Sequence, residues 1–131
     1  MNLRWPALAA TLILSGVWFV NGCYAKLLGF VPRHQAIVAR FVGEDLAAVL
    51  TPLIGLGEMA MACWILSGVR RRWCAAAQAF LIITMNSLEL LWARDLLLFP
   101  RLMPLANALL LLVAYMWSRP AAQRASAIKY T

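Results

Sequence analysis

Residues 46–68 read LAAVLTPLIGLGEMAMACWILSG, and this stretch decides the fold class of the chain. A helix needs about 20 predominantly apolar residues to cross the hydrocarbon core of a bilayer, and this stretch is long enough. Pro52 lies inside it and predicts either a kink or a late start of the helix. The stretch therefore predicts a transmembrane helix that carries one carboxyl group, Glu58, near the middle of the membrane.

Three further apolar stretches have similar lengths, at about residues 6–28, 74–93 and 102–118. Because lipid offers the backbone no hydrogen bonds, helices fit these stretches far better than strands do. The first stretch follows Arg4 as in a signal peptide, but no convincing small-x-small cleavage site follows it, so we expect a retained helix. The pattern predicts an all-α, four-transmembrane-helix bundle that forms a single domain over residues 1–131, with a cytoplasmic tail over residues 119–131.

The composition supports a membrane protein, since 64% of the residues are hydrophobic and only 13% are charged. A soluble domain of this size has too little interior to hide so much apolar surface. The net charge of +7 would suit a nucleic-acid partner, but Lys and Arg also gather at the cytoplasmic ends of membrane helices. We therefore expect the lipid bilayer as the partner and no nucleic acid.

The cations divide unevenly between the two sides of the predicted bundle. Five cations on one side are offset by three acidic residues, whereas the other side holds seven of the 12 Lys and Arg residues and no acidic residue: Arg4, Arg70, Arg71, Arg72, Arg119, Arg124 and Lys129. By the positive-inside bias, both termini face the cytoplasm.

The connection between the first two predicted spans, about residues 29–45, reads GFVPRHQAIVARFVGED. Its apolar residues alternate with polar ones that include Arg33 and His34. This pattern favours a short amphipathic helix, lying in the membrane interface or capping the mouth of the bundle, over an ordinary connecting loop.

The polar residues inside the spans fall on coherent helix faces. Thr51, Gly55 and Glu58 share one face of the second span, and Asn86 and Glu89 share one face of the third. Small residues let helices approach closely, and buried carboxyl groups are candidates for function. Two interpretations fit Glu58 equally well: a carboxylic acid that is hydrogen-bonded to a neighbouring helix, or a group that relays protons or contacts a ligand. The Asn86–Glu89 pair fits the lining of a small polar pocket.

Two polar residues lie toward the end of the first span. We interpret Lys26 as an interfacial lysine that extends its amine toward the membrane surface rather than as a buried counter-ion, within reach of Glu89 at a similar depth. Asn21 lies more than about 100° around a regular helix from Lys26, so we expect it to contact a different neighbour. We expect both Asn21 and Asn107 to form hydrogen bonds between helices.

Several kinds of site lack the residues they need. The three cysteines have no C-x-x-C spacing, and His34 is the only histidine, which is too few for a haem or zinc site of several histidines. There is no glycine-rich phosphate loop and no G-x-S-x-G motif. We expect no metal, no evident cofactor and no catalytic residues, and a binding partner rather than an enzyme.

Three stretches, SGVWFVNGCYAKLLGFVPRHQAIVARFVG, IGLGEMAMACWILSG and MNSLELLWARDLLLFP, together resemble the DoxX-like family of small bacterial membrane proteins. The resemblance implies a four-helix, multi-pass protein of the bacterial inner membrane. Related DoxD-type proteins are similar to subunits of a thiosulfate:quinone oxidoreductase, and DoxX-type proteins are linked with membrane oxidoreductase assemblies. The family implies no catalytic residues for this chain.

These observations support a membrane partner or binding module whose polar interior holds a quinone head group or another small amphiphile. The candidate lining residues are Lys26, Asn21, Thr51, Glu58, Asn86 and Glu89. A small proton-coupled transporter that uses Glu58 or Glu89 is the alternative, as is a membrane subunit of a redox enzyme. A membrane oxidoreductase and a second copy of the chain are the candidate protein partners.

Overall fold

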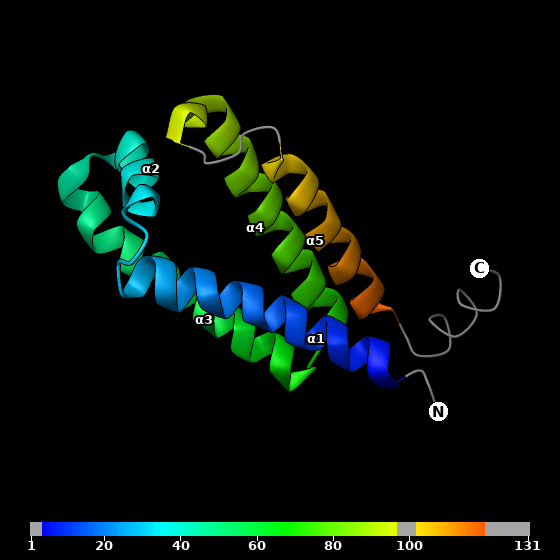
Figure 1. Cartoon of the computed structure of the whole chain (residues 1–131). Helices are drawn as coiled ribbons and strands as arrows, with labels where there is room; N and C mark the ends of the chain where they lie inside the picture. The colour runs from blue at the N-terminus through cyan, green and yellow to red at the C-terminus, as the bar shows by residue number, and fades with distance from the viewer. Residues whose placement is uncertain (1–3, 97–101, 120–131) are drawn as a thin grey trace.

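The helices of a computed structural model follow the order of the apolar stretches (Figure 1). The structure describes residues 4–96 and 102–119, and no strand occurs among them. The elements are α1 (Arg4–Phe19), the π-helical segment η1 (Val20–Leu27), α2 (Pro32–Val42), α3 (Glu44–Ser67), α4 (Arg71–Trp92), the 3-10 segment η2 (Arg94–Leu96) and α5 (Met103–Ser118). The predicted all-α class is confirmed, and the predicted tail beyond residue 119 lies outside the described residues.

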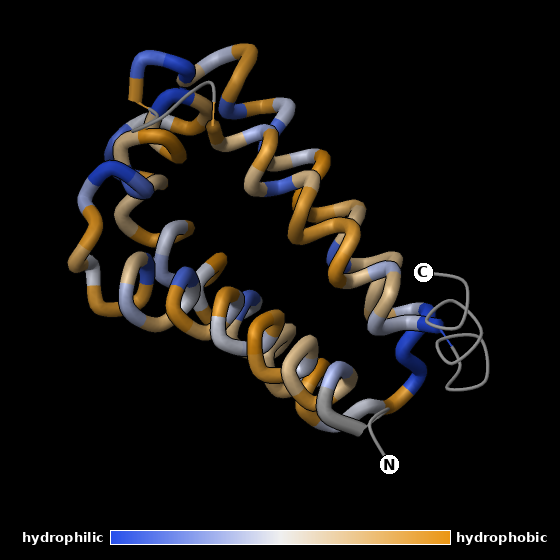
Figure 2. The backbone as a smooth tube through the Cα atoms, turned by 45° about the vertical axis from the view of Figure 1, so that its right-hand side comes forward, coloured by the Kyte–Doolittle hydropathy of each residue, from blue (hydrophilic) through white to orange (hydrophobic). Residues whose placement is uncertain are grey.

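Three of the helices are long and apolar enough to cross a membrane: Pro6–Leu27, Glu44–Ser67 and Arg71–Trp92. These agree with the predicted spans to within a few residues. The fourth predicted span is α5, an apolar helix of 16 residues that is about 24 Å long at 1.5 Å per residue. Apolar residues run along these helices on their outer surfaces, where they can face lipid (Figure 2).

The long helices form two antiparallel pairs, α1–η1 with α3 and α4 with α5, which meet at the end where α1 begins and α5 ends and diverge toward α2 (Figures 1 and 2). Large apolar side chains fill the closed end, among them Leu14, Ile65 and Trp117. Two polar pairs are satisfied within this core: the Trp18 indole donates to Gln78 (3.1 Å) and the Trp117 indole donates to Thr11 (2.9 Å). The core therefore fixes the pairs at one end and leaves room between them at the other.

Gly22 and Gly55 set the distance between η1 and α3. A Cβ atom added to either glycine would lie 2.5 Å from the backbone oxygen of the other. This is closer than any side chain permits, so the two backbones touch because neither residue has one. The predicted face of small and polar residues on the second span is confirmed, since Thr51, Gly55 and Glu58 are all buried.

The last part of the first membrane helix is wound as a π-helix, which the regular period of the sequence did not predict. The Leu28 N–H donates to the Cys23 oxygen at 2.9 Å, five residues back. The wider turn of this segment brings Asn21 and Lys26 closer in direction than 3.6 residues per turn would place them, and both line one pocket.

The amphipathic connection is the helix α2, as predicted, and it bridges the two helix pairs at their open end (Figure 1). Ile37 packs against Ala93, and the Arg40 guanidinium forms two hydrogen bonds with the Asp95 carboxylate, one of 3.1 Å. This contact lowers the pKa of Asp95. The open end is thus covered by α2 and joined to η2.

Pro52 does not delay the start of α3, which begins at Glu44 and continues through the proline. Of the two predicted effects, the late start is therefore wrong. Figure 1 shows the first turns of α3 running in a different direction from the rest of the helix, as a proline ring inside a helix requires.

We expect Gly22→Ala and Gly55→Ala each to destabilise the protein by about 1–3 kcal/mol, because the added methyl group forces two backbones apart. The measurement is thermal unfolding in mild detergent. Gly16 and Gly57 are the matched controls, since a Cβ on either meets no atom within 4 Å. Gly16→Ala and Gly57→Ala should be neutral or slightly stabilising. Equal effects at all four positions would contradict the close contact.

Candidate functional site

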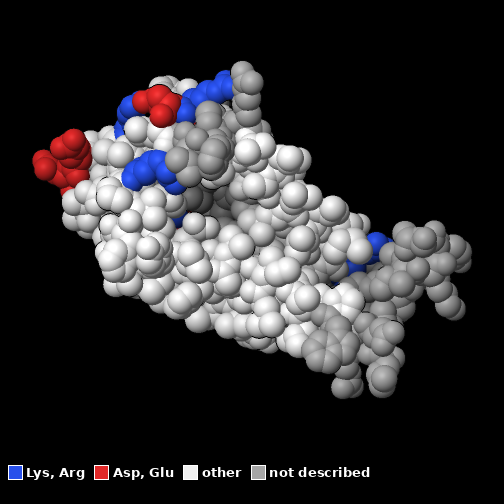
Figure 3. Space-filling view, viewed as in Figure 1, with Lys and Arg blue, Asp and Glu red and all other residues white. Residues whose placement is uncertain are grey.

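A polar pocket lies where the two helix pairs diverge, and Figure 3 shows the surface hollowed there. Its volume is about 120 Å³, and we call it the intramembrane pocket. The polar residues that line it come from η1, α2, α3, α4 and α5: Asn21, Lys26, His34, Glu58, Asn86, Glu89 and Asn107. Five of these were candidate lining residues from the sequence, and His34 had been placed in the amphipathic connection. The apolar part of the lining includes Trp18, Ile82 and Met85.

Lys26 and Glu58 form an ion pair at one side of this pocket. The Lys26 Nζ lies 2.9 Å from both carboxylate oxygens of Glu58, and each residue is only 5% exposed. The interpretation of Lys26 as an interfacial lysine is therefore wrong, and its expected partner Glu89 is replaced by Glu58. The close approach of Gly22 and Gly55 explains this, because it places the two side chains beside each other.

The α4 and α5 side of the pocket carries amides and a second carboxyl group. Asn107 donates to the Asn86 side-chain oxygen at 2.8 Å, which confirms Asn107 as a helix-to-helix contact. Glu89 lies one turn from Asn86 on the same face and is half-buried. No hydrogen bond to its carboxyl group is found among the described residues. Glu89 is thus the acidic group of this pocket that is left for a ligand.

His34 reaches the pocket from α2 and is half-buried. Burial, together with the nearby charges of Lys26 and Arg33, lowers the pKa of His34 to about 4. The imidazole is therefore neutral at pH 7 and carries one N–H donor and one acceptor nitrogen. Arg33 is half-buried but does not line the pocket, and it acts on His34 only through its charge.

Two residues of the site differ from expectation. Thr51 lines a separate pocket beneath α2. Among the described residues, the only lining residue that this pocket has in common with the intramembrane pocket is Lys26. Gln78 was not singled out from the sequence, although it is fully buried and holds the Trp18 indole at the pocket wall. Its position four residues after the buried Cys74, on the inward face of α4, was the signal that could have identified it.

Within residues 4–96 and 102–119 there is no group of three or more His, Cys, Asp and Glu side chains placed to hold a metal ion. The polar groups of the pocket are instead suited to hydrogen bonding.

The apolar helices, with a buried ion pair and a polar pocket between them, define a multi-pass membrane protein. The chain matches the DoxX-like family over residues 15–116 and belongs to that family, which confirms the resemblance. Comparisons with curated proteins and with solved structures gave no match.

The ion pair supports a double-mutant test. Lys26→Met or Glu58→Gln alone removes one partner of a buried charge pair and should cost about 3–5 kcal/mol of stability. The double variant should lose clearly less than the sum of the two, because neither charge is left unpaired. Thermal unfolding in detergent measures the coupling.

The exposed pair Arg40–Asp95 is the control for that test. Arg40→Met and Asp95→Asn should show coupling close to zero, because water screens both groups. A buried pair that couples no more strongly than this exposed pair would contradict the assignment.

His34 predicts a pH dependence of stability. Its folded pKa of about 4 lies below the ordinary value of 6.5, so the unfolded chain binds more protons between these values. Stability should therefore fall as the pH is lowered from about 6.5 toward 4. Between pH 7 and pH 5, we expect the melting temperature to fall by roughly 2–4 °C more in the parent protein than in His34→Gln. Equal drops in the two proteins would show that His34 is not buried in its neutral form.

Proposed function

We propose that this protein binds the polar head of a small membrane amphiphile, a quinone being the best match, in the intramembrane pocket. It acts as a binding module or partner within the membrane and has no reaction of its own. The observation that carries the proposal is the convergence of an unpaired carboxyl group, amides and a neutral imidazole on one small pocket between diverging helix pairs.

The size of the pocket supports a head group rather than a whole ligand. Its 120 Å³ is close to the ~150 Å³ of an engineered cavity that binds a benzene ring, and below the ~300 Å³ at which pockets for complete small ligands begin. A six-membered ring therefore matches the pocket in size. The apolar tail of the ligand has to remain outside, among the lipid-facing helices.

The chemistry of the lining matches a ring with two carbonyl groups. Asn21, Asn86 and His34 supply N–H donors for carbonyl oxygens. Trp18, Ile82 and Met85 supply apolar surface for the ring faces. Glu89 can accept a hydrogen bond from the hydroxyl of a reduced ring or, when protonated, donate one to a carbonyl group.

We further propose that α5 is the fourth transmembrane helix and that the protein lies in the bacterial inner membrane with both termini in the cytoplasm. The Arg71 guanidinium lies 5.2 Å from the centre of the Trp117 ring, so the Arg-rich turn adjoins the end of α5. The start of α1 lies at the same end of the molecule (Figure 1). Arg70, Arg71, Arg72 and Arg119 therefore lie at one end of the molecule, which supports the positive-inside assignment.

Titration of the purified protein with a short-chain ubiquinone tests the proposal, with tryptophan fluorescence as the readout because Trp18 lines the pocket. We expect saturable quenching. Glu89→Leu should raise the Kd about tenfold, which corresponds to about 1.4 kcal/mol and to the loss of one good hydrogen bond.

Asp45→Leu is the matched control, since Asp45 is an exposed carboxylate that lines neither pocket. It should leave the Kd unchanged. Quenching that does not saturate, or the same Kd for both variants and the parent, would sink the proposal.

A further inference from the structure

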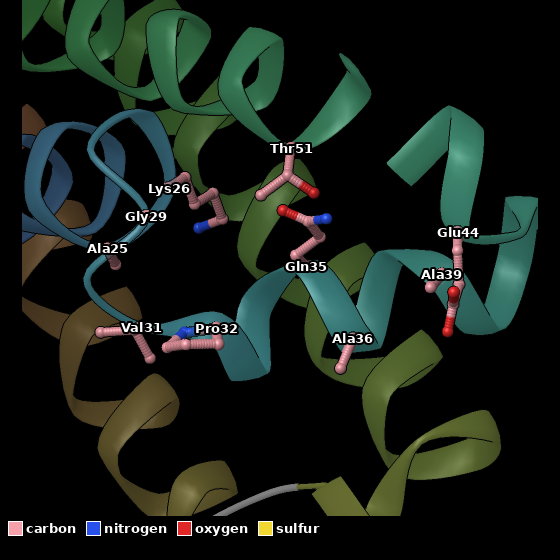
Figure 4. Close-up of a pocket in the computed structure, with 10 residues that line it drawn as sticks. All are labelled: Ala25, Lys26, Gly29, Val31, Pro32, Gln35, Ala36, Ala39, Glu44 and Thr51. Atoms are coloured by element: carbon pink, nitrogen blue, oxygen red, sulfur yellow. The ribbon is translucent and has the colours of Figure 1, made fainter. Parts of the chain in front are cut away.

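A second and larger pocket lies beneath α2, on the other side of the Lys26–Glu58 ion pair. Its volume is about 390 Å³, and it is bounded by the end of η1, the loop that follows, α2 and the first turns of α3. Figure 4 shows Thr51 of α3 and Gln35 of α2 pointing toward each other across it, with Lys26 beside them and Glu44 farther away. We call this space the α2 pocket.

One group in the α2 pocket lacks a partner. The Thr51 hydroxyl is buried, the residue is only 2% exposed, and its oxygen has no hydrogen-bond partner in the described structure. Leaving a buried hydroxyl unbonded costs about 1–3 kcal/mol, so such groups normally bind water or a ligand. The unbonded Thr51 hydroxyl therefore indicates that water or another polar molecule occupies the α2 pocket.

The Lys26 ammonium group also lacks one hydrogen-bond acceptor among the described residues. It has three N–H donors, and two hydrogen bonds lead to the two oxygens of Glu58. Because Lys26 lines both pockets, an acceptor for the third donor can come from either of them. At about 30 Å³ per water molecule, the 390 Å³ of the α2 pocket has room for roughly 13 water molecules.

We propose that the α2 pocket is a water-filled vestibule through which protons pass between the aqueous phase beside α2 and the Lys26–Glu58 pair, and from there the intramembrane pocket. The vestibule does not depend on the proposed head-group binding, because water entry and proton exchange need no quinone. The water beneath α2 and the ligand between the helix pairs are therefore tested separately.

The proton transfer balances with the groups present. Lys26 gives a proton to the Glu58 carboxylate, and the neutral amine takes a proton from hydronium in the vestibule, which becomes water. Glu58 then gives its proton to the Glu89 carboxylate across the intramembrane pocket, and the original ion pair is restored.

The charged and titratable groups that face Glu58 are Lys26 of η1, Glu89 of α4 and His34 of α2, with Arg33 nearby on α2. Glu44 of α3 is the acidic group of the vestibule itself. His34 is a further titratable group that connects α2 with the intramembrane pocket, so the test has to separate a route through His34 from the route through Lys26.

Cysteine accessibility tests the vestibule directly. In a background where Cys23, Cys63 and Cys74 are replaced by alanine, Thr51→Cys and Leu53→Cys are placed in liposomes and treated with a membrane-impermeant thiosulfonate. Leu53 is the control because it lies two residues away in α3 but is exposed on the lipid-facing side. Thiols react as thiolates, which form only where water reaches them.

We expect Thr51→Cys to react about 100-fold faster than Leu53→Cys, and only from the side of the membrane on which α2 lies. Ala36→Cys, in the α2 wall of the vestibule, should react quickly too and supports the test if Thr51→Cys folds poorly. Vestibule residues that react as slowly as Leu53→Cys, or equally from both sides, overturn the proposal.

Infrared spectroscopy of the carboxyl groups after a rapid pH change tests the proton path. Thr51→Val keeps the shape of the side chain but removes the hydroxyl, and it should slow carboxyl protonation about tenfold, equivalent to 1.36 kcal/mol in the barrier. Thr84→Val is the control, since Thr84 lines neither pocket. Unchanged kinetics in Thr51→Val, or slowing in His34→Gln instead, refute this path.

Discussion

The contact between Gly22 and Gly55 is the constraint on which the rest of the molecule depends. It brings the backbones of η1 and α3 together, so that Lys26 and Glu58 meet side by side at 2.9 Å. A lysine or a glutamate alone at this depth would be costly in lipid, and the pair offsets that cost only because both oxygens are bonded to the amine. Two residues without side chains therefore make it possible to bury two charged ones.

The pair also separates the two polar spaces of the protein. On one side lies the intramembrane pocket, which forms because the core around Leu14 and Trp117 holds the helix pairs together at one end only. On the other side lies the larger pocket beneath α2. The amphipathic α2 helix contributes His34 to the first space and Gln35 to the second.

Much of the candidate site could be predicted from the sequence, because polar residues in apolar spans are few and each has to face the interior. Glu58, Asn86 and Glu89 were identified in this way, and they do line one pocket. The role of Lys26 could not be predicted from its place near the end of a span, since an interfacial lysine and a buried one have the same local sequence. The winding of η1 as a π-helix, which changes the angle between Asn21 and Lys26, could not be predicted because nothing in the residues signals it.

Hydropathy and its period depend only on local residues, so they were enough to predict the class of protein, the approximate positions of the apolar helices and the amphipathic character of α2. The sequence also restricted the site to a handful of polar side chains. Only the tertiary structure decided which of these side chains meet: Lys26 with Glu58 rather than Glu89, and Thr51 in a pocket of its own. Those choices follow from the distance and winding of helices that are far apart along the chain, and local sequence carries no measure of either.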